Sequence, residues 1–157
     1  MAQGLINEND NGCDFMFEIK KQFGLENIDP NTYSPLSLAY IGDCVYDLVV
    51  RTVITMQANC PANMLNKKTV YYVKAVNQAK IYDLFLEDEM LTSEEASILR
   101  RGRNAKSATV AKHASVGDYR KATAVEALVG FLYLKGRSDR LIELMKLGME
   151  SIAPESK

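Results

Sequence analysis

Three carboxylates stand inside otherwise apolar helical stretches, and their types and spacing could support metal chemistry. Asp43 and Asp47 lie one helical turn apart in the segment 38–50, which is apolar on nearly every side. Glu126 is the one carboxylate in the apolar segment 122–134. A buried, ionised carboxylate is costly unless a cation, a hydrogen-bond network or a metal compensates it. The question that the sequence raises is therefore what compensates these acids.

Helical geometry suggests that two of these acids face each other. Counting about 100° per residue, Asp43 and Asp47 share one side of their helix, opposite a wholly apolar face. Apolar residues also flank Asp43, so we expect both sides of the helix to be covered and Asp43 to be partly withdrawn from water. Gly42 beside Asp43 and Gly130 on the face of Glu126 leave room for the two helices to approach closely. Two facing carboxylates repel unless one is protonated or a divalent cation lies between them.

A plainer interpretation is that each acid pairs with an arginine in the core or caps a backbone amide. No Lys or Arg shares the face of Glu126, and Arg51 lies two turns from Asp43, so neither acid has an obvious local cation. Asp47 is expected to pair with Arg51, one turn further along the helix. A site of few carboxylates, completed by water and phosphate oxygens, is typical of Mg²⁺.

The elements that must position these acids are helices, because the apolar residues recur at helical and never convincingly at alternating spacing. We predict an all-α fold. The start signals are Ser34-Pro35, Asn59-Cys60-Pro61, the capping box Thr92-Ser93-Glu94-Glu95, and Asp118 as a cap. The expected helices span about 15–23, 35–56, 62–85, 93–103, 119–134 and 138–152, with a mobile basic loop at 104–117. Residues 13–152 form one expected domain, between tails at 1–12 and 153–157.

Composition limits the function classes. The 157 residues carry a formal net charge of −1, but the stretches 48–82 and 96–117 contain bases and no acid, so a basic face remains possible. Three cysteines without a CxxC pattern, and one histidine, predict neither a zinc site nor a disulfide framework. We see no secretion signal and no membrane-spanning stretch, and we expect a cytoplasmic protein.

Three ordered motifs resemble a known family. Tyr40-Ile41-Gly42-Asp43-Cys44-Val45-Tyr46-Asp47 is similar to the signature of ribonuclease III domains, and Val125-Glu126-Ala127-Leu128-Val129-Gly130 resembles that family's second motif. The run Arg101-Gly102-Arg103-Asn104-Ala105-Lys106-Ser107 and the approach Tyr119-Arg120 to Ala122-Thr123 resemble the Mini-ribonuclease III branch, which lacks a double-stranded-RNA-binding domain. The resemblance covers about residues 35–149.

The resemblance implies a Mg²⁺-dependent endoribonuclease, with Mn²⁺ as an alternative metal, that hydrolyses double-stranded RNA. Asp43 and Glu126 match the carboxylates on which metal binding and hydrolysis depend. Three further family acids are replaced here by Leu36, Ala39 and Thr123, which implies a reduced metal site. The implied products carry 5′-phosphate and 3′-hydroxyl ends with a short 3′ overhang. The implied substrate is a structured ribosomal RNA precursor of the 23S type.

The resemblance also implies partners. Arg101, Arg103, Asn104 and Lys106 supply guanidinium, amide and ammonium groups around a flexible glycine, a composition that suits RNA phosphates and 2′-hydroxyls. Alone, such a run is more often a solvated helix end. Lys67 and Lys68 are weaker candidates, and His113 in the same basic loop is expected to face RNA or solvent. Family members are homodimers whose signature helices pack together, and the apolar excess of segment 38–50 agrees with this.

Two other hypotheses stay open on the sequence. The chain could be a non-catalytic RNA-binding or ribosome-associated helical dimer, in contact with a ribosomal protein or an assembly intermediate, that kept the fold after losing three acids. It could also be a purely structural dimer in which Asp43 and Glu126 settle subunit packing. Cleavage of duplex RNA with Mg²⁺ distinguishes the enzyme from both.

Overall fold

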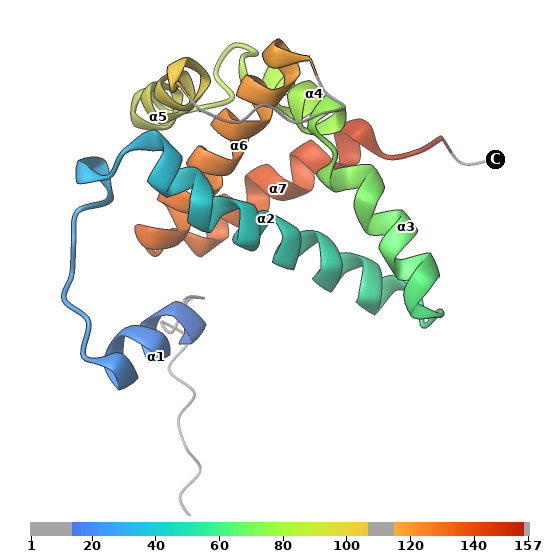
Figure 1. The fold of residues 1–157 in the computed structure, drawn as a ribbon, viewed down its shortest axis with the longest axis horizontal. Helices are drawn as coiled ribbons and strands as arrows, with labels where there is room; N and C mark the ends of the chain where they lie inside the picture. The colour runs from blue at the N-terminus through green and yellow to red at the C-terminus, as the bar shows by residue number, and fades with distance from the viewer. Residues whose placement is uncertain (1–13, 107–114, 156–157) are drawn as a thin grey trace, which may run out of the picture.

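The computed structural model describes residues 14–106 and 115–155, which fold into seven α-helices and one short 3₁₀-helix (Figure 1). The all-α prediction is confirmed, and no β-strand occurs among the described residues. The helices are α1 (Asp14–Phe23), α2 (Pro35–Gln57), α3 (Ala62–Val73), α4 (Ala75–Phe85), α5 (Ser93–Asn104), α6 (Val116–Leu134) and α7 (Ser138–Ile152), with the 3₁₀-helix η1 at Pro30–Thr32. The expected N-terminal tail lies outside the described residues.

Several helix ends lie where local sequence signals predict them. Ser34 caps α2 by accepting a hydrogen bond from the Ser37 amide at 3.1 Å, and Pro35 occupies the first turn. Thr92 and Glu95 form the predicted capping box at the start of α5. Helix α1 ends before Gly24, whose φ of 61° lies in the left-handed region that favours glycine.

Two predicted boundaries are wrong. The expected helix 62–85 is two helices, α3 and α4, because the chain is extended at Lys74 (φ −67°, ψ 143°). The side-chain amide of Asn77 donates to the Tyr71 carbonyl oxygen at 2.6 Å and so satisfies a backbone group at this corner. Helix α6 begins at Val116, not at Tyr119, because Ser115 rather than Asp118 is the cap, accepting from the Asp118 amide at 3.0 Å.

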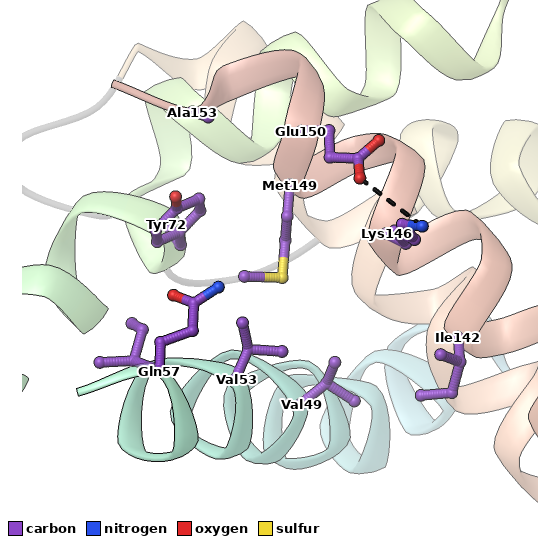
Figure 2. Close-up of a pocket in the computed structure, with 10 residues that line it drawn as sticks. Val49, Val53, Gln57, Tyr72, Ile142, Lys146, Met149, Glu150 and Ala153 are labelled. Carbon is purple, nitrogen blue, oxygen red and sulfur yellow. Dashed lines mark ion pairs between the residues drawn. The ribbon is translucent and has the colours of Figure 1, made fainter. Parts of the chain in front are cut away.

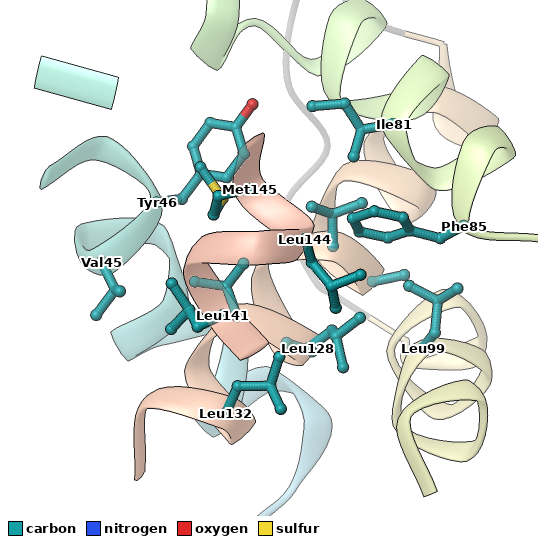
Figure 3. Close-up of a cluster of buried hydrophobic side chains, with 14 of the residues drawn as sticks. Val45, Tyr46, Ile81, Phe85, Leu99, Leu128, Leu132, Leu141, Leu144 and Met145 are labelled. Carbon is teal, nitrogen blue, oxygen red and sulfur yellow. The ribbon is translucent and has the colours of Figure 1, made fainter. Parts of the chain in front are cut away.

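Helix α6 is the centre of the fold and packs against α2, α4, α5 and α7. Nearly all of its residues from Ala122 to Leu132 are buried, with Glu126 the half-buried exception. Figure 3 shows the core, where side chains of α2, α4, α5 and α7 converge on Leu128 and Leu132 of α6. An element buried on all sides fixes its side chains tightly, so a functional group on α6 has a well-defined place.

Candidate functional site

Helices α2 and α6 meet at two glycines, Gly42 and Gly130. A Cβ atom on Gly42 would lie 1.7 Å from the carbonyl oxygen of Glu126, and one on Gly130 would lie 2.0 Å from the carbonyl oxygen of Leu38. No real side chain tolerates such distances, so the two backbones touch here because both positions lack a Cβ atom. The expectation of a close helix approach at Gly42 and Gly130 agrees with this geometry.

This crossing brings Asp43 and Glu126 together. Asp43 follows the glycine that contacts the backbone of Glu126, and the two carboxylates interact electrostatically. Burial, together with the nearby charge of Asp43, raises the pKa of Glu126 to about 8, although a hydrogen bond from the Gln78 side chain acts in the opposite direction. A pKa this high means that the metal-free pair holds a proton near neutral pH.

The expectation that Asp43 is withdrawn from water is wrong, because its side chain is exposed. Ala39, Tyr46 and Val50, which flank it, are buried as expected, whereas Tyr40 is 81% exposed. The face of α2 that carries Tyr40 and Asp43 is not covered by another described helix, whereas the adjoining faces pack against α6 and α3. The site thus combines a half-buried acid on α6 with an open one on α2, which a ligand can reach from solvent.

The chemistry of this pair suits a hard divalent cation. Neither acid forms an ion pair among the described residues, so no lysine or arginine neutralises them. No group of three or more His, Cys, Asp or Glu residues gathers in the described part of the chain. Two carboxylate ligands leave most positions of an octahedral Mg²⁺ to water and phosphate oxygens. The donor set therefore fits a loosely held Mg²⁺ or Mn²⁺ and does not suit zinc.

The positions of the three replaced family acids show the same reduced site. Ala39 is buried, and Leu36 is 38% exposed one turn earlier on α2. Thr123 is buried on α6, and its hydroxyl donates to the Tyr119 carbonyl oxygen at 3.0 Å, within its own helix. None of the three supplies a carboxylate to the pair.

Asp47 pairs with Arg51, as the sequence predicts. The Arg51 Nε atom lies 2.8 Å from Asp47 Oδ2, and both side chains remain substantially exposed. An exposed pair one turn apart contributes only about 0.3–0.5 kcal/mol to stability. Asp47 therefore has a partner of its own on the open face of α2, and we assign it no part in the candidate cation site.

The basic run lies at the end of α5, against the turn of α6 that carries Glu126. Gly102 is buried, and a Cβ atom there would lie 2.8 Å from the Cα atom of Ala124 and 3.1 Å from the Cβ atom of Ala127. The expectation of a flexible glycine is therefore wrong, because Gly102 is a packing residue. Residues 124–127 of α6 are thus flanked by α5 on one side and α2 on another.

The predicted RNA-binding residues are not equivalent in the structure. Arg101 is half-buried, and its Nη2 atom donates to the Tyr33 carbonyl oxygen at 3.3 Å, tying α5 to the segment before α2. Arg103 is half-buried, whereas Asn104 and Lys106 are exposed. Lys67 and Lys68 are exposed on α3, and no described contact links them to the acid pair. His113 lies outside the described residues.

Sequence reasoning missed one residue at the site, Gln78. Gln78 is 2% exposed on α4, and its side-chain amide acts to lower the pKa of Glu126. The available signal was a pair of adjacent amides, Asn77 and Gln78, within the otherwise largely apolar segment 73–85. Buried amides need partners, so such a pair marks either a structural corner or a polar site.

A groove elsewhere on the molecule is unsuited to this chemistry. It has a volume of about 410 Å³ and lies between the C-terminal half of α2, Tyr72 of α3 and one side of α7 (Figure 2). Val49, Val53 and Met149 make its lining largely apolar. Glu150, the carboxylate in that lining, lies 3.8 Å from Lys146. The acid pair at the α2–α6 crossing remains the better candidate site.

Comparison with known proteins agrees with the site. The Ribonuclease III domain family matches residues 36–137 of the chain. A Mini-ribonuclease 3 from a Thermoanaerobacter species is 50% identical over 76% of this chain and 82% of its own length. The Mini-ribonuclease 3 of Staphylococcus aureus is 47% identical over 71% and 84%, respectively. A crystal structure of a Fusobacterium nucleatum protein superposes with a TM-score of 0.69 at 30% identity, covering 78% of this chain and 96% of that one.

Proposed function

Because the chain belongs to the ribonuclease III domain family, in the branch of the Mini-ribonuclease 3 proteins, and is an endoribonuclease, we propose that Asp43 and Glu126 are its catalytic carboxylates and hold Mg²⁺. The observation that carries the proposal is the juxtaposition of the two acids at the Gly42–Gly130 crossing. The substrate is double-stranded RNA, the substrate class on which the family acts. Mn²⁺ can replace Mg²⁺, because both cations take oxygen ligands.

The division of labour between the two acids follows from their surroundings. Glu126 is half-buried, held on the central helix, and provides a fixed anchor. Asp43 is exposed and faces the direction from which an RNA phosphate must arrive. Asp43 and Glu126 would hold the Mg²⁺, which would make a nearby water a stronger nucleophile and would offset negative charge on the phosphate. Hydrolysis leaves the 5′-phosphate on one fragment and the 3′-hydroxyl on the other.

RNA binding is assigned to the end of α5. Arg103 and Lys106 offer cations to phosphates, and Asn104 offers an amide to 2′-hydroxyls across a minor groove. Because Gly102 seats α5 directly on the turn of α6 that carries Glu126, these groups start from a fixed position near the acids. Arg101 contributes partly by holding α5 in place through Tyr33. Lys67 and Lys68 are assigned a peripheral contact with the duplex.

We further propose a homodimer formed through the open face of α2. Tyr40, Leu48 and Met56 lie on this helix at spacings of eight residues and are 81%, 55% and 82% exposed, respectively. Eight residues turn an α-helix by about 80°, so Tyr40 and Leu48 lie on adjoining parts of the exposed side of α2, and large exposed apolar side chains of this kind are typical of a covered interface. A two-fold dimer packs the same face of both copies together, so each copy brings one acid pair to one side of a shared duplex. Sedimentation velocity is expected to give a dimer at micromolar concentration, and Leu48→Asp a monomer; a wild-type monomer would contradict this assembly.

We propose a structured ribosomal RNA precursor of the 23S type as the substrate, by extension from the ribonuclease III resemblance. We place the enzyme in the cytoplasm, where it would meet ribosomal proteins or assembly intermediates bound to that precursor. No described helix is long and apolar enough to cross a membrane.

The test is incubation of end-labelled duplex RNA with the purified protein in Mg²⁺, Mn²⁺ or EDTA. Wild-type protein is expected to cut both strands and leave 5′-phosphates in either metal, and Asp43→Asn or Glu126→Gln to bind the duplex without cutting it. Retained binding without any metal-dependent cleavage by the wild type would favour the non-catalytic RNA-binding alternative. Neither binding nor cleavage would favour a structural dimer.

A further inference from the structure

Helix α1 and the segment that follows it, residues 14–29, form an arm beside the helical bundle. Figure 1 shows α1 apart from the other helices, and it packs extensively against none of them. A cleft of about 420 Å³ lies between the arm and the bundle. Met16 and Ile19 of the arm line the cleft on one side, and Ile41 of α2 and Leu134 of α6 line it on the other. A largely apolar opening of this size is typical of a binding site for another group.

We propose that the cleft receives the C-terminal end of α2 from a second copy of this chain, with Met56 as the inserted side chain. Met56 is 82% exposed on its own chain. The inference rests on the proposed homodimer, and it assigns to that dimer a contact that the open face of α2 does not include. The ribonuclease III domain family matches residues 36–137, so the arm lies outside the matched part.

The cleft is continuous with the open face of α2. Residues at intervals of three or four form a stripe along this helix, namely Ile41, Cys44, Leu48, Thr52 and Thr55. Ile41 is half-buried, and the other four are exposed. Because Ile41 belongs both to the stripe and to the lining of the cleft, a helix that packs along the stripe also reaches the cleft.

Two-fold symmetry brings Met56 to this cleft. Ile41 and Thr55 each lie seven residues from Leu48, so an antiparallel pair of α2 helices centred on Leu48 sets Ile41 of one copy against Thr55 of the other. Counted around the helix from Leu48, Ile41 lies about 20° and Met56 about 80° to the same side. Antiparallel two-fold packing exchanges the ends of the helices but keeps their sides. Met56 of the second copy therefore lies beside the cleft.

A parallel pair of helices would leave the cleft without an occupant. In that arrangement, Met56 meets Met56 of the second copy, at the end of α2 remote from Ile41. Antiparallel packing also sets opposite ends of the helix dipoles side by side, which is the favourable arrangement.

The chemistry of the cleft suits a methionine. Tyr33 and Tyr133 contribute aromatic rings to its lining, and a thioether makes favourable contacts with such rings and fills irregular gaps. Phe15, Ile19 and Phe23 recur every four residues and share one face of α1. The two phenylalanines, 70% and 76% exposed, thus flank the residue that lines the cleft and offer further apolar surface to the second copy.

The arms and the acid pairs lie on opposite sides of this dimer. Asp43 lies about 140° around α2 from Leu48, on the side away from Ile41 and Met56. Because antiparallel two-fold packing keeps the sides, both acid pairs are on one side and both arms on the other. The arms therefore strengthen the dimer without obstructing the approach of RNA.

The first test is sedimentation equilibrium of the full-length protein. Ile19→Asp and Met56→Ala are each expected to weaken dimerisation at least about tenfold, because each removes apolar burial at two symmetric contacts. Phe17→Asp is the matched control on α1, since Phe17 lies about 160° around the helix from Ile19. Leu86→Ala, at a leucine that is 60% exposed just after α4, is the control for Met56. Neither control should change the dimerisation constant.

A cleavage assay then separates the arm from the catalytic site. At protein concentrations well above the new dimerisation constant, Ile19→Asp and Met56→Ala should cleave duplex RNA at the wild-type rate. A dimerisation constant unchanged by Ile19→Asp, or weakened equally by Phe17→Asp, would overturn this inference and leave the proposed homodimer standing. A wild type that sediments as a monomer would overturn the proposed homodimer first, and this inference with it.

Photo-crosslinking identifies the occupant directly. p-Benzoylphenylalanine in place of Ile19 is incorporated into dimers mixed from isotopically light and heavy chains. We expect it to crosslink to residues 55–58 of the other chain. Crosslinks confined to its own chain, or to another region of the second copy, would overturn the assignment of Met56 to the cleft.

Discussion

Replacing Gly42 by alanine probes the helix crossing on which the site depends. The new Cβ atom would lie 1.7 Å from the Glu126 carbonyl oxygen, 2.6 Å from its carbonyl carbon and 2.8 Å from the Gly130 nitrogen. Ordinary contacts are about 3.5 Å long, so the helices must separate by roughly 1.8 Å. All three contacts are backbone atoms, which cannot rotate aside as the end of a side chain can.

The expected cost is both structural and functional. Overpacking a core costs about 1–3 kcal/mol and occasionally more, and a backbone clash places Gly42→Ala at or above the upper end. The same displacement moves Asp43 relative to Glu126, and a misplacement of about 1 Å can slow catalysis by about 100-fold. We therefore expect a lower urea midpoint and, in the folded fraction, cleavage of duplex RNA slowed by about this factor.

Gly117→Ala is the matched control for the Gly42 variant. Gly117 also lies in a helix, in the first turn of α6, but a Cβ atom there would meet nothing closer than Ser115 Oγ at 3.9 Å. The exchange should be neutral or should stabilise the protein by up to about 1 kcal/mol, because alanine is the better helix former. If Gly42→Ala unfolds at the same urea concentration as the wild type and cleaves as fast, the close crossing is not what positions the acids.

Three further predictions test the electrostatics and the contacts around the site. In EDTA, the stability of the wild type to urea should fall as pH rises from 4.5, the ordinary pKa of Glu, to about 8, because folded Glu126 retains a proton that the unfolded chain has lost. Glu126→Gln should remove this dependence on pH. The same dependence in both proteins would exclude Glu126 as its source. Arg140→Met should lower the free energy of unfolding by about 3–5 kcal/mol, since the Arg140 Nε atom lies 2.9 Å from Oε1 of Glu95, which is 2% exposed. Arg137→Met, which removes the exposed pair with Glu94, should lower it by less than about 1 kcal/mol. Equal urea midpoints for the two variants would contradict this prediction. Arg103→Met should weaken the binding of duplex RNA and reduce the steepness of log affinity against log salt concentration by about one. Lys80→Met, on α4, is the charge-matched control. Equal salt slopes for the two variants would exclude Arg103 from the RNA interface.

Local signals in the sequence predicted much of this fold because their physics is local. Ser34 followed by Pro35, and Thr92 followed by Glu95, mark helix starts through hydrogen bonds that close within a few residues. The small residues beside each acid likewise predicted where α2 and α6 touch, since only glycine permits that contact. The resemblance to ribonuclease III domains then supplied the chemistry that composition alone left open.

What the sequence could not predict depends on long-range packing. The break at Lys74 carries no proline or glycine, and Asn77 satisfies the corner through a bond that spacing alone does not reveal. Helical angles place Asp43 opposite an apolar face of α2. They do not show which faces of that helix are covered by other parts of the chain, so the exposure of Asp43 was missed. Gln78 was missed because its role depends on the packing of α4 beside Glu126.

The most direct test of the central claim is the single-turnover rate of duplex RNA cleavage in Mg²⁺, with enzyme in excess, for the wild type, Asp43→Asn and Glu126→Gln. Both variants keep the size of the side chain and remove one negative charge. We expect each to cleave at least about 10³-fold more slowly than the wild type, with no more than small changes in urea midpoint. Cleavage by either folded variant within tenfold of the wild-type rate would contradict the assignment of this acid pair as the catalytic centre.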